Sequence, residues 1–181
     1  MADVPLFVFE SRWHRRQVGA LLGRLPRLAG APILVRSARG LRDRHGAVHA
    51  GSFLRDRAII FDCCRAEFRR VFVHEVFHFA WLRSGNAVRL SWENLMRGEL
   101  RAGARGELGW SAEWRKLALS AGDMESRSRR WREYCCESFC DTAAWLYSGV
   151  LRHDEFTLTG GFRIGRRVWF RETVESAQLR L

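Results

Sequence analysis

The stretch that decides the fold is VFVHEVFHFAWL, residues 71–82. Every position in it is apolar except His74, Glu75 and His78. A segment that is apolar on all sides predicts a helix buried inside the protein. Two buried imidazoles and a buried carboxylate are costly unless they are paired or bound to something. The stretch therefore indicates a central helix whose three polar side chains have a specific partner.

The spacing of the two histidines indicates what that partner is. His74 and His78 are one helical turn apart and lie on the same face. Both imidazoles can therefore reach one metal ion. Glu75 sits beside the first histidine, where its carboxylate can contact a water on the metal rather than the metal itself. The alternative is that all three are core residues satisfied by hydrogen bonds; the apolar surroundings favour the metal.

A catalytic zinc site needs a third protein ligand, because it has three ligands and one open position. None of the other histidines follows His78 within a few residues; these are His14, His45, His49 and His153. The better candidate is Glu137, with Asp141 one turn further on in a helix predicted over residues 131–147. Small and apolar neighbours predict that this helix is buried too. Asp141 can then hold a ligand histidine by accepting a hydrogen bond from it.

Three other residues compete with Glu137 for the third position: Cys136, Cys140 and Asp141. Cys140 follows Glu137 by three residues and can share its face of the helix. For the cysteines, simple packing as small apolar side chains is the preferred interpretation. The same interpretation applies to Cys63 and Cys64.

The pattern His74-Glu75-x-x-His78, followed by Glu137-x-x-x-Asp141, resembles the gluzincin group of zinc metallopeptidases. The resemblance implies that His74, His78 and Glu137 bind Zn²⁺, that Glu75 is the general base, and that Asp141 supports a ligand histidine. It covers residues 32–84 and 131–147 and assigns no family within the group.

The same resemblance implies a zincin-like fold, in which a peptide substrate lies along a sheet edge just before the first metal-binding helix. Here that edge is residues 51–54 or 58–62. Two features depart from the group. Phe77 stands where related motifs often have glycine, and the chain between His78 and Glu137 is long. Phe77 takes no part in the expected chemistry. The long chain between His78 and Glu137 bears on whether Glu137 is the third ligand.

A peptidase of this kind also needs a donor for the oxyanion of the tetrahedral intermediate. Tyr134 is our candidate because it lies three residues before Glu137, on nearly the same face. Tyr147, His153 and Arg167 are alternatives.

The remaining pattern predicts an α+β fold in one domain, residues 1–181. Strands are expected at 5–10, 33–36, 48–54 and 58–62. Helices are expected from Ser11 to about Leu28 and at 66–83, 92–100, 112–119 and 131–147. Residues 86–130 form a helical insertion or lid carrying Trp92, Trp110 and Trp114. Residues 153–181 fit either a helix or a hairpin.

Composition narrows the class of protein. Hydrophobic residues make up 47% of the 181, enough for a real core. The five cysteines are odd in number and include no CxxC pair, which argues against a disulfide framework and a zinc ribbon. The apolar run at residues 4–9 is too short for a signal peptide, and no run reaches the roughly 18 residues of a membrane span. We therefore expect a cytoplasmic protein without a membrane partner.

The net charge of +11 is compatible with a second class of protein, one that binds nucleic acid. Lys116 is the sole lysine among 31 basic residues, and the arginines are spread along the chain. They form local clusters at residues 12–16, 36–44, 127–132 and 163–171. Nucleic-acid binding is therefore possible but not favoured over a peptide or protein substrate. The alternatives are a basic DNA-associated or regulatory protein, a non-catalytic metal-binding domain, and a zinc hydrolase acting on another bond. Nothing in the sequence sets the oligomeric state.

Overall fold

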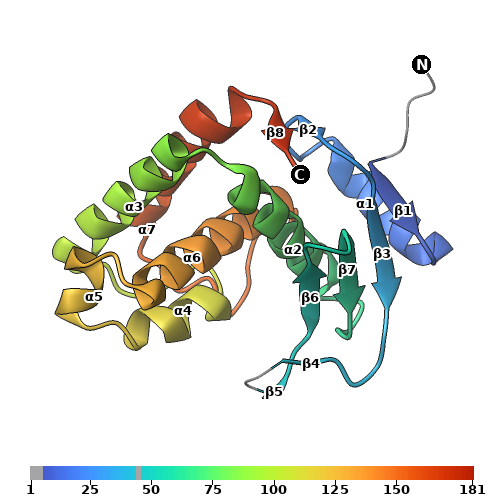
Figure 1. The fold of residues 1–181 in the computed structure, drawn as a ribbon, viewed down its shortest axis with the longest axis horizontal. Coiled ribbons are helices and arrows are strands. Elements are labelled where there is room, and N and C mark those ends of the chain that lie inside the picture. Colours follow the sequence, from blue (N-terminus) through green and yellow to red (C-terminus); the bar gives the residue numbers. More distant parts are fainter. Residues whose placement is uncertain (1–5, 44–45) are drawn as a thin grey trace.

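A computed structural model describes residues 6–43 and 46–181. Its N-terminal part is a small sheet, and its C-terminal part is a group of helices packed beside that sheet (Figure 1). In the described part, the sheet has the strand order β1-β3-β7-β6. These strands are β1 (Phe7–Phe9), β3 (Ile33–Ser37), β7 (Ala58–Phe61) and β6 (Ala50–Phe53). The predicted α+β class with a small mixed sheet is confirmed.

The direction of the strands decides which one is at the edge. β1, β3 and β7 run parallel, whereas β6 pairs antiparallel with β7 and has no further strand on its outer side among the described residues. All four residues of β7 are buried, as expected for an apolar strand inside a sheet. The prediction left the edge open between 51–54 and 58–62. The second choice is wrong, because β7 lies between β3 and β6.

A short hairpin leads into the edge strand. It consists of β4 (Arg42–Asp43) and β5 (Gly46–Ala47), which pair antiparallel. Residues 44–45, including His45, lie outside the described part. The first predicted strand also begins at Pro5, outside the described residues, and is observed at Phe7–Phe9.

Helix α1 (Arg12–Leu22) connects β1 to β3. It begins as predicted at Ser11, whose hydroxyl accepts a hydrogen bond from the backbone N–H of Trp13 at 3.2 Å. It ends earlier than predicted, because Pro26 cannot continue a helix. The chain beyond it forms β2 (Leu28–Ala29), which pairs in parallel with β8 (Leu179–Arg180) near the C-terminus.

Two long helices form the centre of the molecule. α2 (Phe68–Arg83) packs against α6 (Arg129–Tyr147) on one side and against the edge of the sheet formed by β6 and β7 on the other (Figure 1). Most apolar positions of α2 are buried, as the sequence 71–82 predicts, but Val71 and Trp81 are partly buried and Leu82 is 50% exposed. α6 begins at Ser128, whose hydroxyl accepts from Trp131 N at 3.2 Å.

The segment predicted as an insertion or lid divides into two parts. α3 (Asn86–Arg101) packs on α6 and contributes Trp92, which is fully buried and donates to the carbonyl oxygen of Cys135 at 2.9 Å. α4 (Trp110–Leu117) and the short α5 (Ala121–Glu125) also pack on α6. Trp110 and Trp114 of α4 are 62% and 37% exposed. α3 is therefore part of the core, whereas α4 carries the exposed tryptophans.

The C-terminal part is helical, which decides between the two predicted alternatives. α7 (Gly160–Phe170) continues into a π-helical turn, η1 (Arg171–Glu175), before β8. Within the described residues, none of the helices combines the length and the apolar character needed to cross a membrane.

One buried charge cluster, which we call the Arg166 cluster, ties α7 to the rest of the helices. Arg166 is fully buried and bonds to Glu99 of α3 and to Glu107 before α4, each at 2.7 Å. Lys116 Nζ lies 3.3 Å from Glu107 Oε1, and the Tyr134 hydroxyl donates to the same oxygen at 2.7 Å. Both carboxylates thus have cationic partners inside the protein.

Candidate metal centre

Three donor atoms from α2 and α6 converge on one point; we call them the His/Glu group. The Nε2 atoms of His74 and His78 are 3.1 Å apart. Glu137 Oε2 lies 3.3 Å from His74 Nε2 and 3.8 Å from His78 Nε2. The side chains of His78 and Glu137 are 20% and 13% exposed, so the group lies near the surface.

These separations fit the donor set of a tetrahedral metal ion. Zinc ligands of this type lie about 2.0–2.1 Å from the ion, which places them about 3.3–3.4 Å from one another. The three observed separations lie on both sides of that value. Two imidazole nitrogens and one carboxylate oxygen are also the donors that zinc takes in catalytic sites.

The hydrogen bonding of His74 favours a proton or a metal ion at its Nε2 atom. Its Nδ1 is 2.7 Å from Asp141 Oδ1, and a carboxylate only accepts, so this contact favours the tautomer with the proton on Nδ1. The free lone pair on Nε2 then faces a carboxylate oxygen and another imidazole nitrogen. Such acceptors repel one another unless a proton or a metal ion lies between them.

The pKa values follow the same logic. Burial disfavours the charged form of His74, but Asp141 and Glu137 outweigh burial and raise its pKa well above the ordinary value. Burial likewise opposes the charge on His78, yet Glu137 and Cys136 raise its pKa to about 9. Burial would raise the pKa of Glu137, but His78 and His74, with Arg115, hold it at about 2. The group therefore attracts positive charge.

Asp141 connects the group to a third helix, α4. While Oδ1 contacts His74, Oδ2 accepts from the backbone N–H of Ala112 in the first turn of α4 at 2.9 Å. Gly109 permits this approach, because a Cβ at that position would overlap the carboxylate of Asp141. Asp141 therefore lies beside His74, the histidine that the sequence predicted it to support.

Glu75 lies next to the group but faces the sheet. Its carboxylate Oε2 accepts a hydrogen bond from the hydroxyl of Ser52 at 2.5 Å, and the same hydroxyl is 2.8 Å from the Glu75 carbonyl oxygen. Ser52 belongs to the edge strand β6. The sequence offered no signal for Ser52, because its contact depends on how α2 packs on β6.

Arg115 of α4 is a second residue that sequence reasoning missed. Its Nη2 lies 3.1 Å from Glu137 Oε1, the oxygen that does not face the histidines. The guanidinium is held by the carbonyl oxygen of Ser111 at 2.8 Å and by the ring of Trp114, 4.3 Å from its centroid. Arg115 therefore fixes the orientation of Glu137 and leaves Oε2 directed at the histidines.

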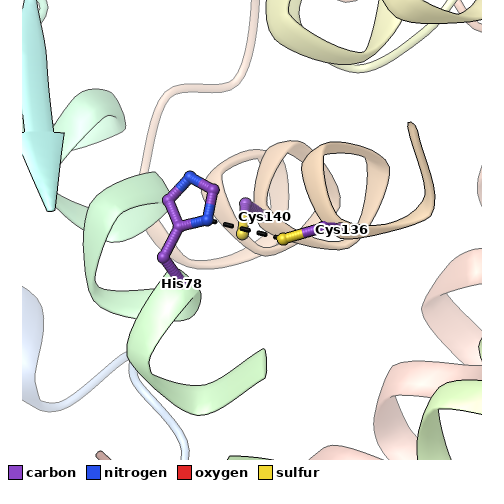
Figure 2. A group of neighbouring side chains, drawn as sticks. All are labelled: His78, Cys136 and Cys140. Carbon is purple, nitrogen blue, oxygen red and sulfur yellow. Dashed lines mark hydrogen bonds between the residues drawn. The ribbon is translucent and has the colours of Figure 1, made fainter. Parts of the chain in front are cut away.

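The thiols of Cys136 and Cys140 lie against the other nitrogen of His78 (Figure 2). Cys136 Sγ is 3.5 Å from His78 Nδ1. A hydrogen bond with Cys140 and the neighbouring His78 outweigh burial and lower the pKa of the Cys136 thiol to about 6. All five cysteines lie in the described part of the chain and are free thiols.

The structure does not bring the predicted oxyanion donor to the group. Tyr134 is fully buried, and its hydroxyl donates to Glu107 in the Arg166 cluster. The side chain leans toward the start of α6, as helical side chains do, and this takes its hydroxyl away from Glu137. The alternatives are also engaged elsewhere: Tyr147 bonds to Glu175, His153 contacts Glu67, and Arg167 stacks on Trp145.

The basic cluster at residues 127–132 is partly neutralised within the chain. Arg127 makes two hydrogen bonds to Glu93, at 2.7 and 2.9 Å, and Arg129 pairs with Glu133 at 2.8 Å. Two of its arginines thus have carboxylate partners.

We compared the chain with known proteins. No protein-family model matches it, and neither the curated proteins nor the solved structures include a match.

Proposed function

We propose that this chain is a zinc-dependent hydrolase that cleaves peptide bonds, with a zincin-like arrangement and a gluzincin-type ligand set. The observation that carries the proposal is the convergence of His74 Nε2, His78 Nε2 and Glu137 Oε2 at separations of 3.1–3.8 Å. Two features support it. The candidate base Glu75 directly follows His74 in the sequence, and Asp141 accepts a hydrogen bond from His74 Nδ1, the nitrogen that faces away from the group. Neither feature is needed for a helix that is merely packed in a core.

A zinc ion in this group would acidify a water molecule and polarise the carbonyl of the scissile bond. The protein's own groups do the rest. Glu75 takes the proton of the attacking water and passes it to the leaving amine. Ser52 holds the Glu75 carboxylate on the side of the sheet edge. Arg115 keeps Glu137 turned so that one oxygen faces the histidines.

The proposed substrate is an extended peptide that adds to the edge of the sheet. β6 pairs only with β7, so the backbone groups on its outer side are available to a further strand in the described structure. Ser52 lies in that strand and contacts Glu75, so a peptide paired with β6 passes close to the base. Phe53, 39% exposed on the same strand, offers an apolar contact to a substrate side chain.

The test is peptide cleavage by zinc-loaded protein, measured with a fluorogenic peptide library. We expect Glu75→Gln to bind zinc normally and to cleave about 10²–10⁴-fold more slowly, because it removes the proton acceptor and no ligand. Glu125→Gln is the matched control, since Glu125 is an exposed carboxylate on α5, and it should cleave at the wild-type rate. Undiminished cleavage by Glu75→Gln, or no cleavage by zinc-loaded wild type, would refute the proposal.

A further inference from the structure

His78 presents its two ring nitrogens to two different sets of donors. Nε2 belongs to the His/Glu group, with His74 and Glu137. Nδ1 faces the sulfur of Cys136 at 3.5 Å, on the side where Cys140 also lies (Figure 2). A metal-binding histidine usually gives its second nitrogen to a carboxylate, a carbonyl oxygen or water. Here that second nitrogen faces a pair of thiols instead.

The two cysteines are placed to act together. They are one turn apart in α6, so both sulfurs lie on the side of the helix that faces α2. His78 Nδ1 and the two Sγ atoms all lie within 4.8 Å of one another. Cys140 is fully buried and Cys136 is partly buried, so solvent reaches the pair only from one side.

The separation of sulfur and nitrogen also fits a metal site. With about 2.3 Å to sulfur and about 2.0–2.1 Å to nitrogen, two tetrahedral zinc ligands lie about 3.6 Å apart. The observed distance from Cys136 Sγ to His78 Nδ1 is 3.5 Å. The carboxylates of Glu137 and Asp141 act electrostatically on Cys140, which adds negative charge around the thiols. This surrounding favours a cation.

We propose that His78 Nδ1, Cys136 Sγ and Cys140 Sγ form a second metal site, selective for thiolate-preferring ions such as Cd²⁺, Cu⁺ or a second Zn²⁺. Thiolates select such ions over Mg²⁺ and Ca²⁺. Each thiol that becomes a ligand releases its proton to solvent. His78 must also give up its remaining N–H proton to hold an ion on each nitrogen, so the two sites compete for the ring. The proposal does not require that the protein hydrolyses anything.

The experiment is a titration with Cd²⁺, followed by the ultraviolet absorption of the cadmium–thiolate bond. Wild type is expected to develop this absorption to saturation at the thiol site. Replacing both Cys136 and Cys140 by alanine should abolish it, while the variant still binds Zn²⁺ at the His/Glu group. The matched control, Cys63→Ala with Cys64→Ala, should keep the full absorption because these thiols lie elsewhere.

A variant of the other group separates the two sites. His74→Ala removes a ligand of the His/Glu group and should leave the cadmium–thiolate absorption in place. If the absorption disappears in His74→Ala, the thiols are ligands of a single shared site and the proposal is overturned. Absence of the absorption in wild type, or its persistence without Cys136 and Cys140, overturns it as well.

If the double variant does not fold, the single variants Cys136→Ala and Cys140→Ala replace it. Each is expected to weaken the cadmium–thiolate absorption, and an unchanged absorption in both contradicts the site. Because the readout is optical and needs no substrate, failure of peptide cleavage leaves this test intact. Conversely, a chain that cleaves peptides but shows no thiolate absorption loses only the second site.

Discussion

The helix α6 contributes to two buried polar clusters that differ in how their charges are balanced. In the Arg166 cluster, the carboxylates of Glu99 and Glu107 are matched by Arg166 and Lys116. In the His/Glu group, the carboxylates of Glu137 and Asp141 have one permanently cationic neighbour, Arg115, and two imidazoles whose Nε2 atoms lie 3.1 Å apart.

The difference predicts that the Arg166 cluster is structural, whereas the His/Glu group takes up a cation. Buried charges are tolerated when their partners are inside the protein, and such a network holds elements together. A cluster with fewer cationic side chains than carboxylates must obtain positive charge from solvent, as a proton or as a metal ion. The following variants test whether the two clusters behave as different kinds of site, from the largest expected effect to the smallest.

Removing the central cation of the Arg166 cluster is expected to have the largest effect. Arg166→Met leaves Glu99 and Glu107 buried without their main partner, which should lower the free energy of unfolding by about 3–5 kcal/mol. Urea unfolding measures this, and the zinc bound per folded chain should not change. Arg171→Met, at an exposed arginine, is the control and should stay within about 0.5 kcal/mol. A loss below about 1 kcal/mol for Arg166→Met would contradict the structural role.

The metal-free His/Glu group should make stability depend on pH. The pKa of His78 is raised from 6.5 to about 9, so its stabilising contribution is fully present below pH 6.5 and is lost as the pH rises through 9. The shift corresponds to about 3 kcal/mol, and the raised pKa of His74 acts in the same direction. The pKa of the neighbouring Cys136 thiol is lowered to about 6, and this acts in the opposite direction over the same pH range. Urea unfolding of chelator-treated Cys136→Ala protein from pH 6 to pH 10 therefore isolates the loss.

Two comparisons sharpen this pH dependence. His78→Gln should flatten the loss, whereas His49→Gln, at an exposed histidine, should leave it unchanged. Zinc-loaded protein should also lack the loss, because the ion replaces the proton as the cation of the group. A metal-free protein as stable at pH 9.5 as at pH 6.5 would show that the group does not need a cation.

The hydrogen bond behind His74 should affect metal binding more than folding. Asp141→Asn weakens the acceptor for His74 Nδ1 and is expected to reduce zinc affinity about 10–100-fold. Competition with a zinc-binding dye measures this change. An affinity within about twofold of wild type would mean that Asp141 only docks α4 through Ala112.

The smallest effect is expected at the tyrosine that the sequence placed near the metal. Tyr134→Phe removes one of several donors to Glu107 and should cost about 1 kcal/mol of stability. Zinc affinity and peptide cleavage should stay at wild-type values, because the hydroxyl belongs to the Arg166 cluster. A selective loss of cleavage with zinc still bound would restore Tyr134 as an oxyanion donor.

The sequence predicts those parts of the molecule that depend on local helical periodicity. The apolar run at 71–82 predicts α2, and spacing along two helices is enough to nominate His74, His78 and Glu137 for one site. The structure brings these three together because α2 and α6 pack side by side. Their metal remains a prediction.

The parts it missed depend on packing between distant elements. Arg115 reaches Glu137 only because α4 lies on α6, and Ser52 reaches Glu75 only because of the position of β6 beside α2. Tyr134 was misplaced because spacing gives the direction of a Cβ, not where a long side chain ends. The pairing of β2 with β8 joins residues some 150 positions apart and has no local signal.

If the His/Glu group binds zinc as proposed, the two hydrogen bonds of Asp141 couple zinc binding to the docking of α4. One oxygen holds His74 and the other holds Ala112 in the first turn of α4. Linkage is reciprocal: if zinc binding strengthens the docking of that turn, strengthening the docking raises zinc affinity by the same factor. A partner that contacts the exposed rings of Trp110 and Trp114 on α4 would therefore change the zinc affinity of the His/Glu group through Asp141.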